Sequence, residues 1–216
     1  MVLNPQGEPL NDKVRIRTPR PADPAAILKV IAKLTKTQPD FRRISIGFPG
    51  VVQYGVISSA PNLDGDWAGV PLAERVRQLT GKPCRVANDA DMQGYGAIEG
   101  SGVEMVLTLG TGMGSAVFSN GHLVPNLELG HHPCADGLTY EQLVGKAARK
   151  TCGNASWNQR VKLVIDLVRR IWNPRVLYIG GGNVKHLTFA LPHNVRTVAN
   201  VAGIIGGICL WEDEDH

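Results

Sequence analysis

The chain has 216 residues, of which 43% are hydrophobic and 19% are charged. Such a composition is typical of a globular protein with a core of its own, and it excludes a low-complexity or disordered chain. The net charge of +4 comes from basic residues that are scattered rather than grouped, which favours a solvated surface. A face for a polyanion is the alternative, because basic residues are spread over a helical region between residues 146 and 170.

Membrane and secretion signals are not evident in the sequence. The longest apolar run, residues 201–211, has 11 residues and is too short to cross a bilayer. No basic start followed by an apolar segment opens the chain, so no signal peptide is expected. The four cysteines show no zinc spacing, and Cys84 and Cys209 lie in apolar runs typical of small core residues. We therefore expect a protein of the reducing cytoplasm.

The first part of the chain predicts alternating strands and helices. Residues 14–17 alternate as in a strand and are followed by two prolines. A helix is expected from Pro24, with Asp23 as its N-cap, because apolar residues then recur at helical spacing. After it the sequence predicts a strand at 43–48, a hairpin around Gly55, a helix at 71–80 closed by Gly81, a buried strand at 84–87 and a helix from Asp89.

The second part repeats this order of strands, hairpins and helices. The sequence predicts three strands joined by turns at 104–124, helices at 139–151 and 158–172, a strand from 175 that ends in glycines, a strand at 194–200 and an apolar C-terminal helix with small residues on one face. Two such passes favour two α/β lobes with a cleft between them. The first lobe is expected at 1–102, completed by a helix at 203–216, and the second at 103–202.

A glycine-rich turn lies between two of these strands, in the stretch GTGMG at residues 110–114. Glycines accept positive φ and allow a ligand close to the backbone, and successive free N–H groups in such a turn can hold an anion. Thr111 could add a hydroxyl donor. The stretch is neither a Walker loop nor a dinucleotide-binding motif, because it lacks the Gly-Lys-Ser/Thr ending and a strand follows it. Taken alone, it is also compatible with a hairpin that binds nothing.

Asn88 and Asp89 lie where a buried strand meets a helix. Both residue types are preferred helix caps, so a capping role is one interpretation. The other interpretation is that Asp89 accepts a proton from a substrate hydroxyl. Phosphoryl transfer requires little more of a protein than such a base, fixed geometry and neutralisation of charge.

The stretch ELGHH places Glu128 and His131 three residues apart. Glu-x-x-His binds metal in helical bundles, where it occurs in two copies on helical backbone. This chain has one copy, with Gly130 inside it and Pro133 after it, which disfavours a metal. Hydrogen bonding to a polyol fits better, because a carboxylate accepts from hydroxyls and an imidazole both donates and accepts. Glu141 is a further candidate, unless it only places a favourable charge in the first turn of its helix.

A second glycine run, Gly180, Gly181 and Gly182, ends a predicted strand. It allows the close approach of a nucleotide or a phosphate chain. A plain turn between a strand and a helix would explain it as well. The four motifs together are less ambiguous than any one of them.

In their order along the chain, these motifs resemble the ROK family of sugar kinases, which have the actin-like ATPase fold, and within it the branch of polyphosphate glucokinases. The resemblance covers nearly the whole chain. It rests on the stretches GFPGVV, APNLDGDW, VANDADMQGYG, LTLGTGMGSA, LVPNLELGH and LYIGGGN. It implies a two-lobed α/β fold of the ribonuclease H-like type.

The resemblance also implies a role for each candidate residue. Asp89 matches the family's catalytic base. The residues that hold the sugar match Asn88, Asp89, Glu128, His131 and Glu141. The second phosphate loop matches Gly110, Thr111, Gly112 and Gly114, and the segment near the nucleoside end of the donor matches Gly180, Gly181 and Gly182. The glycine turn would hold phosphate, and the Glu-x-x-His would hold the sugar that receives it.

Two departures from the family pattern change these expectations. Many members carry a cysteine-rich zinc motif between the His and the last Glu, whereas this chain has HPCADGLTY with a lone Cys134, so no structural zinc is expected. The family also opens with a strand and an Asp-x-Gly-Gly-Thr loop that grips the donor phosphates. The stretch MVLNPQGEPL resembles the arm after that loop, which implies that the first strand and loop are missing and that turnover is slow.

We therefore expect a hexose kinase that uses ATP or polyphosphate, with Mg²⁺ accompanying the donor and glucose phosphorylated at its 6-hydroxyl for glycolysis. A homodimer without nucleic-acid or membrane partners is expected. The alternative is a truncated sugar-binding or regulatory protein of the same family without turnover. A sugar-responsive repressor would need a helix-turn-helix before the kinase-like part, and the sequence has no room for one.

Overall fold

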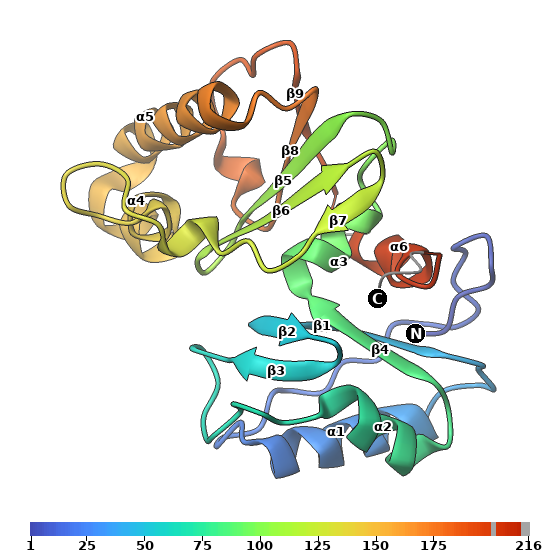
Figure 1. Cartoon of the computed structure of the whole chain (residues 1–216). Helices are drawn as coiled ribbons and strands as arrows, with labels where there is room; N and C mark the ends of the chain where they lie inside the picture. The colour runs from blue at the N-terminus through green and yellow to red at the C-terminus, as the bar shows by residue number, and fades with distance from the viewer. Residues whose placement is uncertain (200–201, 213–216) are drawn as a thin grey trace. The chain divides into compact units, whose positions relative to one another are not determined.

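The computed structural model describes residues 1–199 and 202–212, and the chain divides into two compact units. Unit 1 consists of Met1–Asp89 together with the chain's end from Gly207, and unit 2 of Ala90–Gly206. Both units combine strands with helices, as the α/β prediction requires. Figure 1 shows the helices and strands of both units.

Unit 1 contains two helices that lie side by side on one side of its strands (Figure 1). Helix α1 (Pro24–Lys36) begins as predicted, because the Asp23 carboxylate accepts a hydrogen bond of 2.8 Å from the Ala26 N–H. Helix α2 (Leu72–Thr80) ends at Gly81, whose φ of 68° is the left-handed conformation that glycine adopts without strain. Both helix ends are therefore set by local sequence.

The strands of unit 1 form two small sheets. Strand β1 (Ile44–Phe48) pairs in parallel with β4 (Cys84–Asn88), and β2 (Val51–Gln53) forms the predicted hairpin with β3 (Val56–Ser59). The core beneath them gathers around Trp67, whose indole N–H donates to the carbonyls of Ala22 and Asp64. The buried residues of this core are Phe48, Val52, Ile57, Trp67, Val70, Leu72, Val76 and Val86.

The end of the chain returns to β1 and β4. The Trp211 indole N–H donates to the Ser45 hydroxyl at 2.9 Å, and the guanidinium groups of Arg43 and Arg85 lie 5.0 and 4.9 Å from the centre of the Trp211 ring. Arg85 also donates to the Leu210 carbonyl at 2.6 Å. Cation–π contacts and hydrogen bonds thus attach the last described residues to the first strand pair.

Unit 2 is built on a five-stranded sheet in the order β7-β6-β5-β8-β9. Its strands are β5 (Val103–Leu109), β6 (Met113–Ser119), β7 (His122–Val124), β8 (Val176–Gly180) and β9 (Val195–Thr197). The first three form an antiparallel meander, and β8 and β9 continue from β5 in parallel. All five strands were predicted, the last at 194–200, of which residue 200 lies outside the described part.

Helices cover both faces of this sheet. The long helix α5 (Lys146–Trp172) packs on one face through Trp157, Val161, Val164, Ile165 and Val168, which are buried against Leu107, Leu109 and Leu177 among others. Helix α3 (Asp89–Tyr95) packs against β6, where the Tyr95 and Phe118 rings meet edge to face at 5.1 Å. The sheet therefore has an apolar layer on each side, as its hydrophobic strands require.

Helix α6 (Ala202–Cys209) lies against α3 at backbone distance. A methyl group on Gly206 would lie 1.7 Å from the Met92 carbonyl oxygen, and one on Gly96 would lie 1.9 Å from that of Ala202. The small residues predicted on one face of the C-terminal helix thus allow the two backbones to meet.

Three predicted elements differ from the structure. The C-terminal helix expected at 203–216 ends at Cys209 and is followed by turns at 210–212, while residues 213–216 lie outside the described part. Residues 12–19 form no strand, because the described residues provide no neighbouring strand to complete a ladder. The expected helix at 139–151 is divided: α4 (Tyr140–Val144) ends at Gly145, and the remainder joins α5, which runs on to Trp172 with a kink at Gly153. The division arises because the Lys146 N–H donates to the carbonyls of Gly110 and Thr111 instead of continuing the helical ladder.

Candidate functional site

The predicted phosphate loop is the tight turn between β5 and β6. Gly110, Gly112 and Gly114 all have ordinary negative or extended φ values, so the expectation that they provide positive φ is wrong. Glycine is instead required at positions 112 and 114 because a larger side chain would not fit. A methyl group on Gly112 would lie 1.9 Å from the Glu141 carboxylate, and one on Gly114 would lie 2.6 Å from the Thr108 hydroxyl.

Two adjacent backbone N–H groups of this turn, those of Thr111 and Gly112, have no hydrogen-bond partner among the residues that the structure describes. The neighbouring donors are occupied: the Gly110 N–H bonds to the Gly112 carbonyl at 3.0 Å, and the Gly114 N–H to the Thr108 hydroxyl at 3.1 Å. Adjacent N–H groups in a turn form a small concavity for an anion. The turn can therefore offer two donors to a phosphate oxygen.

The second glycine run lies directly beside the first. Gly181 has φ 89°, and a methyl group there would lie 2.5 Å from the Leu109 carbonyl oxygen, so only glycine fits. Asn183 joins the two segments, since its backbone N–H donates to the Leu109 carbonyl at 2.9 Å and its side-chain amide to the Gly110 carbonyl at 2.8 Å. The structure thus brings together two motifs that are some 70 residues apart in sequence.

Glu141, in the first turn of α4, lies against the phosphate-loop turn. Its carboxylate accepts a hydrogen bond of 3.3 Å from the Met113 N–H. The helix start is fixed independently by a capping box in which Thr139 and Gln142 bond to each other's backbone N–H groups. In this structure Glu141 is therefore a partner of the turn, and its contact with a sugar stays a prediction.

The Glu-x-x-His segment forms a short 3₁₀ turn, η1 (Leu129–His131), with Glu128 just before it. Ser115 of β6 attaches this turn to the sheet: its hydroxyl donates to the Leu127 carbonyl at 2.9 Å and accepts from the Leu129 N–H at 3.2 Å. His131 is exposed and Glu128 is half-buried. Residues three apart eclipse in a 3₁₀ turn, so we expect both side chains on one side of it, available to one ligand.

An apolar hollow of about 230 Å³ lies beside Glu128. It is lined by Leu127, Glu128, Leu129, His132, Tyr140, Ile171 and Trp172. His132, and not the predicted His131, faces this hollow. Its lining is mainly hydrophobic, which is unlike the set of polar partners that a polyol requires.

Asn88 and Asp89 end the first segment of unit 1, at the junction of β4 and α3. The Asn88 side-chain amide donates to the Gly50 carbonyl at 3.1 Å, and Asn88 lies opposite Phe48 in the strand ladder. Asp89 is exposed at the first residue of α3. This position suits a helix-start carboxylate and equally leaves Asp89 accessible to a substrate.

Several residues that support the site were not singled out in the sequence. Asn183 and Ser115 are buried polar residues that tie the predicted motifs together. Gln93 of α3 lies beneath the second glycine run, where a methyl group on Gly180 would approach its side-chain amide to 2.8 Å. Only the Asn that follows the glycine run in YIGGGN gave a signal, because it stands next to a motif.

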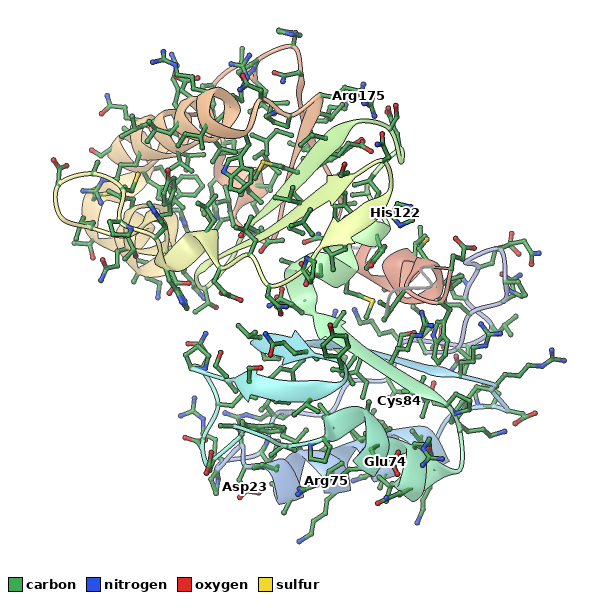
Figure 2. The ribbon with its side chains drawn as sticks, viewed as in Figure 1. Asp23, Glu74, Arg75, Cys84, His122 and Arg175 are labelled. Carbon is green, nitrogen blue, oxygen red and sulfur yellow. The ribbon has the colours of Figure 1, made fainter. Side chains whose placement is uncertain are left out.

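A buried carboxylate anchors the end of the sheet at which β8 begins. Glu104 is fully buried and accepts hydrogen bonds from the Arg175 guanidinium (2.9 Å), the Tyr178 hydroxyl (3.1 Å) and the backbone N–H groups of residues 99–101. Burial, and then the Glu104 charge, raise the pKa of Tyr178 to about 12. Arg175, labelled in Figure 2 and placed directly before β8, completes this cluster.

The described residues form neither a metal-binding cluster nor a membrane-spanning helix. Within 1–199 and 202–212, no three His, Cys, Asp or Glu side chains gather as they would around a metal ion. No described helix is both long and apolar enough to cross a membrane.

The fold defined by these units is that of the actin-like ATPase class. Inorganic polyphosphate/ATP-glucomannokinase from Arthrobacter sp. strain KM matches with a TM-score of 0.82 and 28% identity, over 96% of this chain and 91% of that one. A ROK family glucokinase from Streptomyces griseus, solved with glucose and AMPPNP, matches with a TM-score of 0.75 over 96% of this chain and 93% of that one. At 20% identity, this second likeness shows the fold alone.

The family model that matches the sequence is more specific. It covers residues 1–156, and the chain belongs to the ROK family. Polyphosphate glucokinase from Mycobacterium tuberculosis (strain CDC 1551 / Oshkosh) is 32% identical over 93% of this chain and 81% of its own length. That of Mycobacterium leprae (strain TN) is also 32% identical, and the chain spans 66% of its length. The relatives are thus sugar kinases, as the resemblance predicted.

Proposed function

We propose that the chain is a hexose kinase that transfers a phosphoryl group from polyphosphate or ATP to the 6-hydroxyl of glucose. The observation that carries the proposal is the junction of the two glycine segments through Asn183, which leaves the N–H groups of Thr111 and Gly112 for an anion. The names of the relatives, polyphosphate glucokinase and polyphosphate/ATP-glucomannokinase, support the same class of reaction.

In this proposal Asp89 is the general base. It accepts the proton of the 6-hydroxyl as that oxygen bonds to the terminal phosphorus and the bond from this phosphorus to the donor's bridging oxygen breaks. The leaving group is the shortened polyphosphate or ADP. Backbone N–H groups of the turn stabilise the negative charge on the transferred group.

The sugar would be held by hydrogen bonds from Asn88, Asp89, Glu128, His131 and Glu141. Carboxylates accept from sugar hydroxyls, whereas the Asn amide and the His imidazole can also donate. Glu141 lies against the phosphate-loop turn, so a sugar bound to it would be close to the transferred phosphate. Gly180, Gly181 and Gly182 would lie near the distal part of the donor.

Magnesium would accompany the donor. Mg²⁺ is usually held by substrate phosphates and water with one or two protein carboxylates. The ion would neutralise donor charge, while the residues named above bind and orient the two substrates. We also propose a cytoplasmic homodimer, as the resemblance implied, with no structural zinc.

The test is a donor comparison with purified protein. Glucose is incubated with Mg²⁺ and ATP, Mg²⁺ and polyphosphate, or Mg²⁺ alone, and the product is identified by ³¹P and ¹³C NMR. Glucose 6-phosphate with either donor supports the proposal. Glucose binding without product from either donor would overturn it and favour the non-catalytic sugar-binding alternative.

A further inference from the structure

A group of basic residues leads away from the phosphate-loop turn on two neighbouring segments. Lys146, Arg149 and Lys150 lie in the first turns of α5, and Lys185 and His186 lie in the 3₁₀ turn η2 (Val184–His186). Both segments begin at the turn, because the Lys146 N–H bonds to the carbonyls of Gly110 and Thr111 and Asn183 bonds to that of Gly110. We call these five residues the basic track.

Asn158 holds the two segments together. Its side-chain amide donates to the His186 carbonyl at 2.9 Å and to the Asn154 carbonyl at 2.7 Å, and its oxygen accepts from the Thr188 N–H at 2.8 Å. Asn158 is 6% exposed, so these bonds lie in a largely dry environment where they fix geometry. Asn158 therefore fixes η2 against α5, while the phosphate-loop turn anchors the start of both segments.

Three members of the basic track, Arg149, Lys185 and His186, lie close enough for their charges to interact. The pKa of His186 is lowered by partial burial and then by the positive charges of Arg149 and Lys185. Arg149 is oriented by a 3.1 Å hydrogen bond from its guanidinium to the Asn154 side chain, while its Nε is buried without a partner in the described structure. Arg149 and Lys185 therefore repel a positive charge on His186.

The one carboxylate placed at the start of the basic track in the described structure is Glu141, which bonds to the Met113 N–H of the turn and forms no ion pair with the track. The sequence contains no Asp or Glu between residues 142 and 165 or between 176 and 199. Among the residues that the structure describes, Lys146, Arg149, Lys150 and Lys185 form no ion pair, and the three lysines are exposed. A solvated helix face usually alternates charges of both signs, so this one-sided surface is better explained by an anionic ligand.

We propose that the basic track binds the distal phosphates of a linear inorganic polyphosphate donor whose terminal phosphate lies at Gly110–Gly114. The inference rests on the proposed function and specifies its donor. Lys146 and Lys150 are one helical turn, about 6 Å, apart along α5, and η2 extends the surface to a second segment. A triphosphate would engage the turn and the nearest cation, whereas a longer chain can follow both segments.

An inorganic chain fits this surface better than a nucleic acid. Proteins that bind single-stranded nucleic acid without sequence preference combine cations with exposed aromatic rings on which bases stack. The aromatic residues near the basic track are Trp157, which is fully buried, and Phe189, which packs on the core of unit 2. Lysine ammonium groups act as point charges that accept phosphates in many orientations.

The test compares long-chain polyphosphate with tripolyphosphate in a binding assay at several NaCl concentrations, so it does not depend on turnover. The test variant is Lys150→Gln/Lys185→Gln, and the matched control is Lys162→Gln/Arg170→Gln, which removes two exposed charges from the same long helix. Lys150→Arg/Lys185→Arg keeps the charges and should keep the binding. Unchanged melting temperatures would verify that each variant is folded.

For the unmodified chain, long-chain polyphosphate should bind at least tenfold more tightly than tripolyphosphate at low salt. In the test variant, most of the preference for long-chain polyphosphate over tripolyphosphate should be lost. The slope of log affinity against log salt concentration should also become smaller in magnitude by about 1 to 2, the scale for two lost phosphate contacts. Equal affinity for both phosphates in the unmodified chain, or equal salt slopes for the test and control variants, would overturn the basic track.

A single-stranded oligonucleotide of matched charge provides the comparison ligand. Binding as tight as that of polyphosphate would also overturn the proposal, because the surface would then not select an inorganic chain. Failure of the proposed function is a separate result. If ATP supports turnover but polyphosphate binds equally well without Lys150 and Lys185, the basic track alone is overturned. If polyphosphate binding depends on these lysines but no donor supports turnover, the kinase activity alone is overturned.

Discussion

The two units bury their helices to different degrees. No residue of α1 in unit 1 is fully buried, whereas α5 in unit 2 buries six residues from Trp157 to Val168, mostly in the core on its five-stranded sheet. The described residues of unit 1 form only two-stranded sheets, and their core gathers around one tryptophan. Small sheets need packing from other elements for stability. The comparison suggests that unit 2 holds its candidate residues by its own core, while unit 1 depends more on individual side chains.

The largest effect, on turnover, is expected for Asp89, the proposed general base in unit 1. Asp89→Asn should lower turnover by about 10²–10⁴-fold, because the amide keeps the shape of the side chain but cannot accept a proton. Steady-state kinetics with glucose and either donor measure this, and calorimetric titration should find glucose affinity nearly unchanged. Full turnover in the variant would reduce Asp89 to the helix-start role.

The anchor of unit 2 should give the next largest effect, on stability. Glu104→Ala removes a fully buried carboxylate with five hydrogen-bond donors, and we expect a loss of about 3 kcal/mol in the free energy of unfolding. Urea denaturation measures it. Glu99→Gln, at the exposed end of the same ion-pair cluster, is the control and should cost far less. Similar losses in both variants would mean that burial does not set the strength of this anchor.

Sugar binding should depend on the 3₁₀ turn of unit 2. Glu128→Gln and His131→Ala should each weaken glucose binding by about 1–3 kcal/mol, because each leaves a polar group of the site without its partner. Affinity for the donor should be unaffected. His132→Ala, one residue further along, is the matched control, and calorimetric titration with glucose separates the three. Unchanged affinity in both test variants would remove Glu128 and His131 from the sugar site.

The smallest effect is expected for the reactivity of Cys84, which packs against the small core of unit 1. Burial raises the pKa of the Cys84 thiol, which is labelled in Figure 2, to about 12. Because an unfolded cysteine has a pKa of about 8.5, burial of the neutral thiol contributes stability that is complete below pH ~8.5 and is lost as the pH rises toward about 12.

At pH 9, iodoacetamide should therefore alkylate Cys84 more slowly in the folded chain than in urea, as peptide mass spectrometry would measure. Cys152 of unit 2 serves as an internal reference in the same digest. Equal rates for Cys84 in both states would show that the core of unit 1 opens readily, which would sharpen the contrast between the units.

Local chemistry made most of the fold predictable. The Asp23 cap, the Gly81 helix end and the hairpin around Gly55 each depend on residues close in sequence, and each is found in the structure. The strand expected at residues 14–17 is absent because alternation alone cannot provide a ladder partner. The helix boundary at Gly145 depends on hydrogen bonds to the distant turn at residues 110–111, which no local pattern shows.

The candidate site was predictable to a different extent. Glycine runs and acidic residues have recognisable patterns, so the motifs could be found. The residues that join them, Asn183, Ser115 and Asn158, are single buried polar side chains whose partners are distant in sequence. Their roles follow from tertiary contacts and left no periodicity or spacing to recognise.

The contact between α3 and α6 has a consequence for the tolerance of this chain to mutation. Gly96 and Gly206 both have φ values that any residue can adopt, so their restriction comes only from the carbonyl oxygens less than 2 Å from where a Cβ would be. A library randomised at these two positions and selected for folding should therefore return glycine alone at each. An invariant glycine in such a selection would record the proximity of two backbones, with no turn, ligand or catalytic step involved.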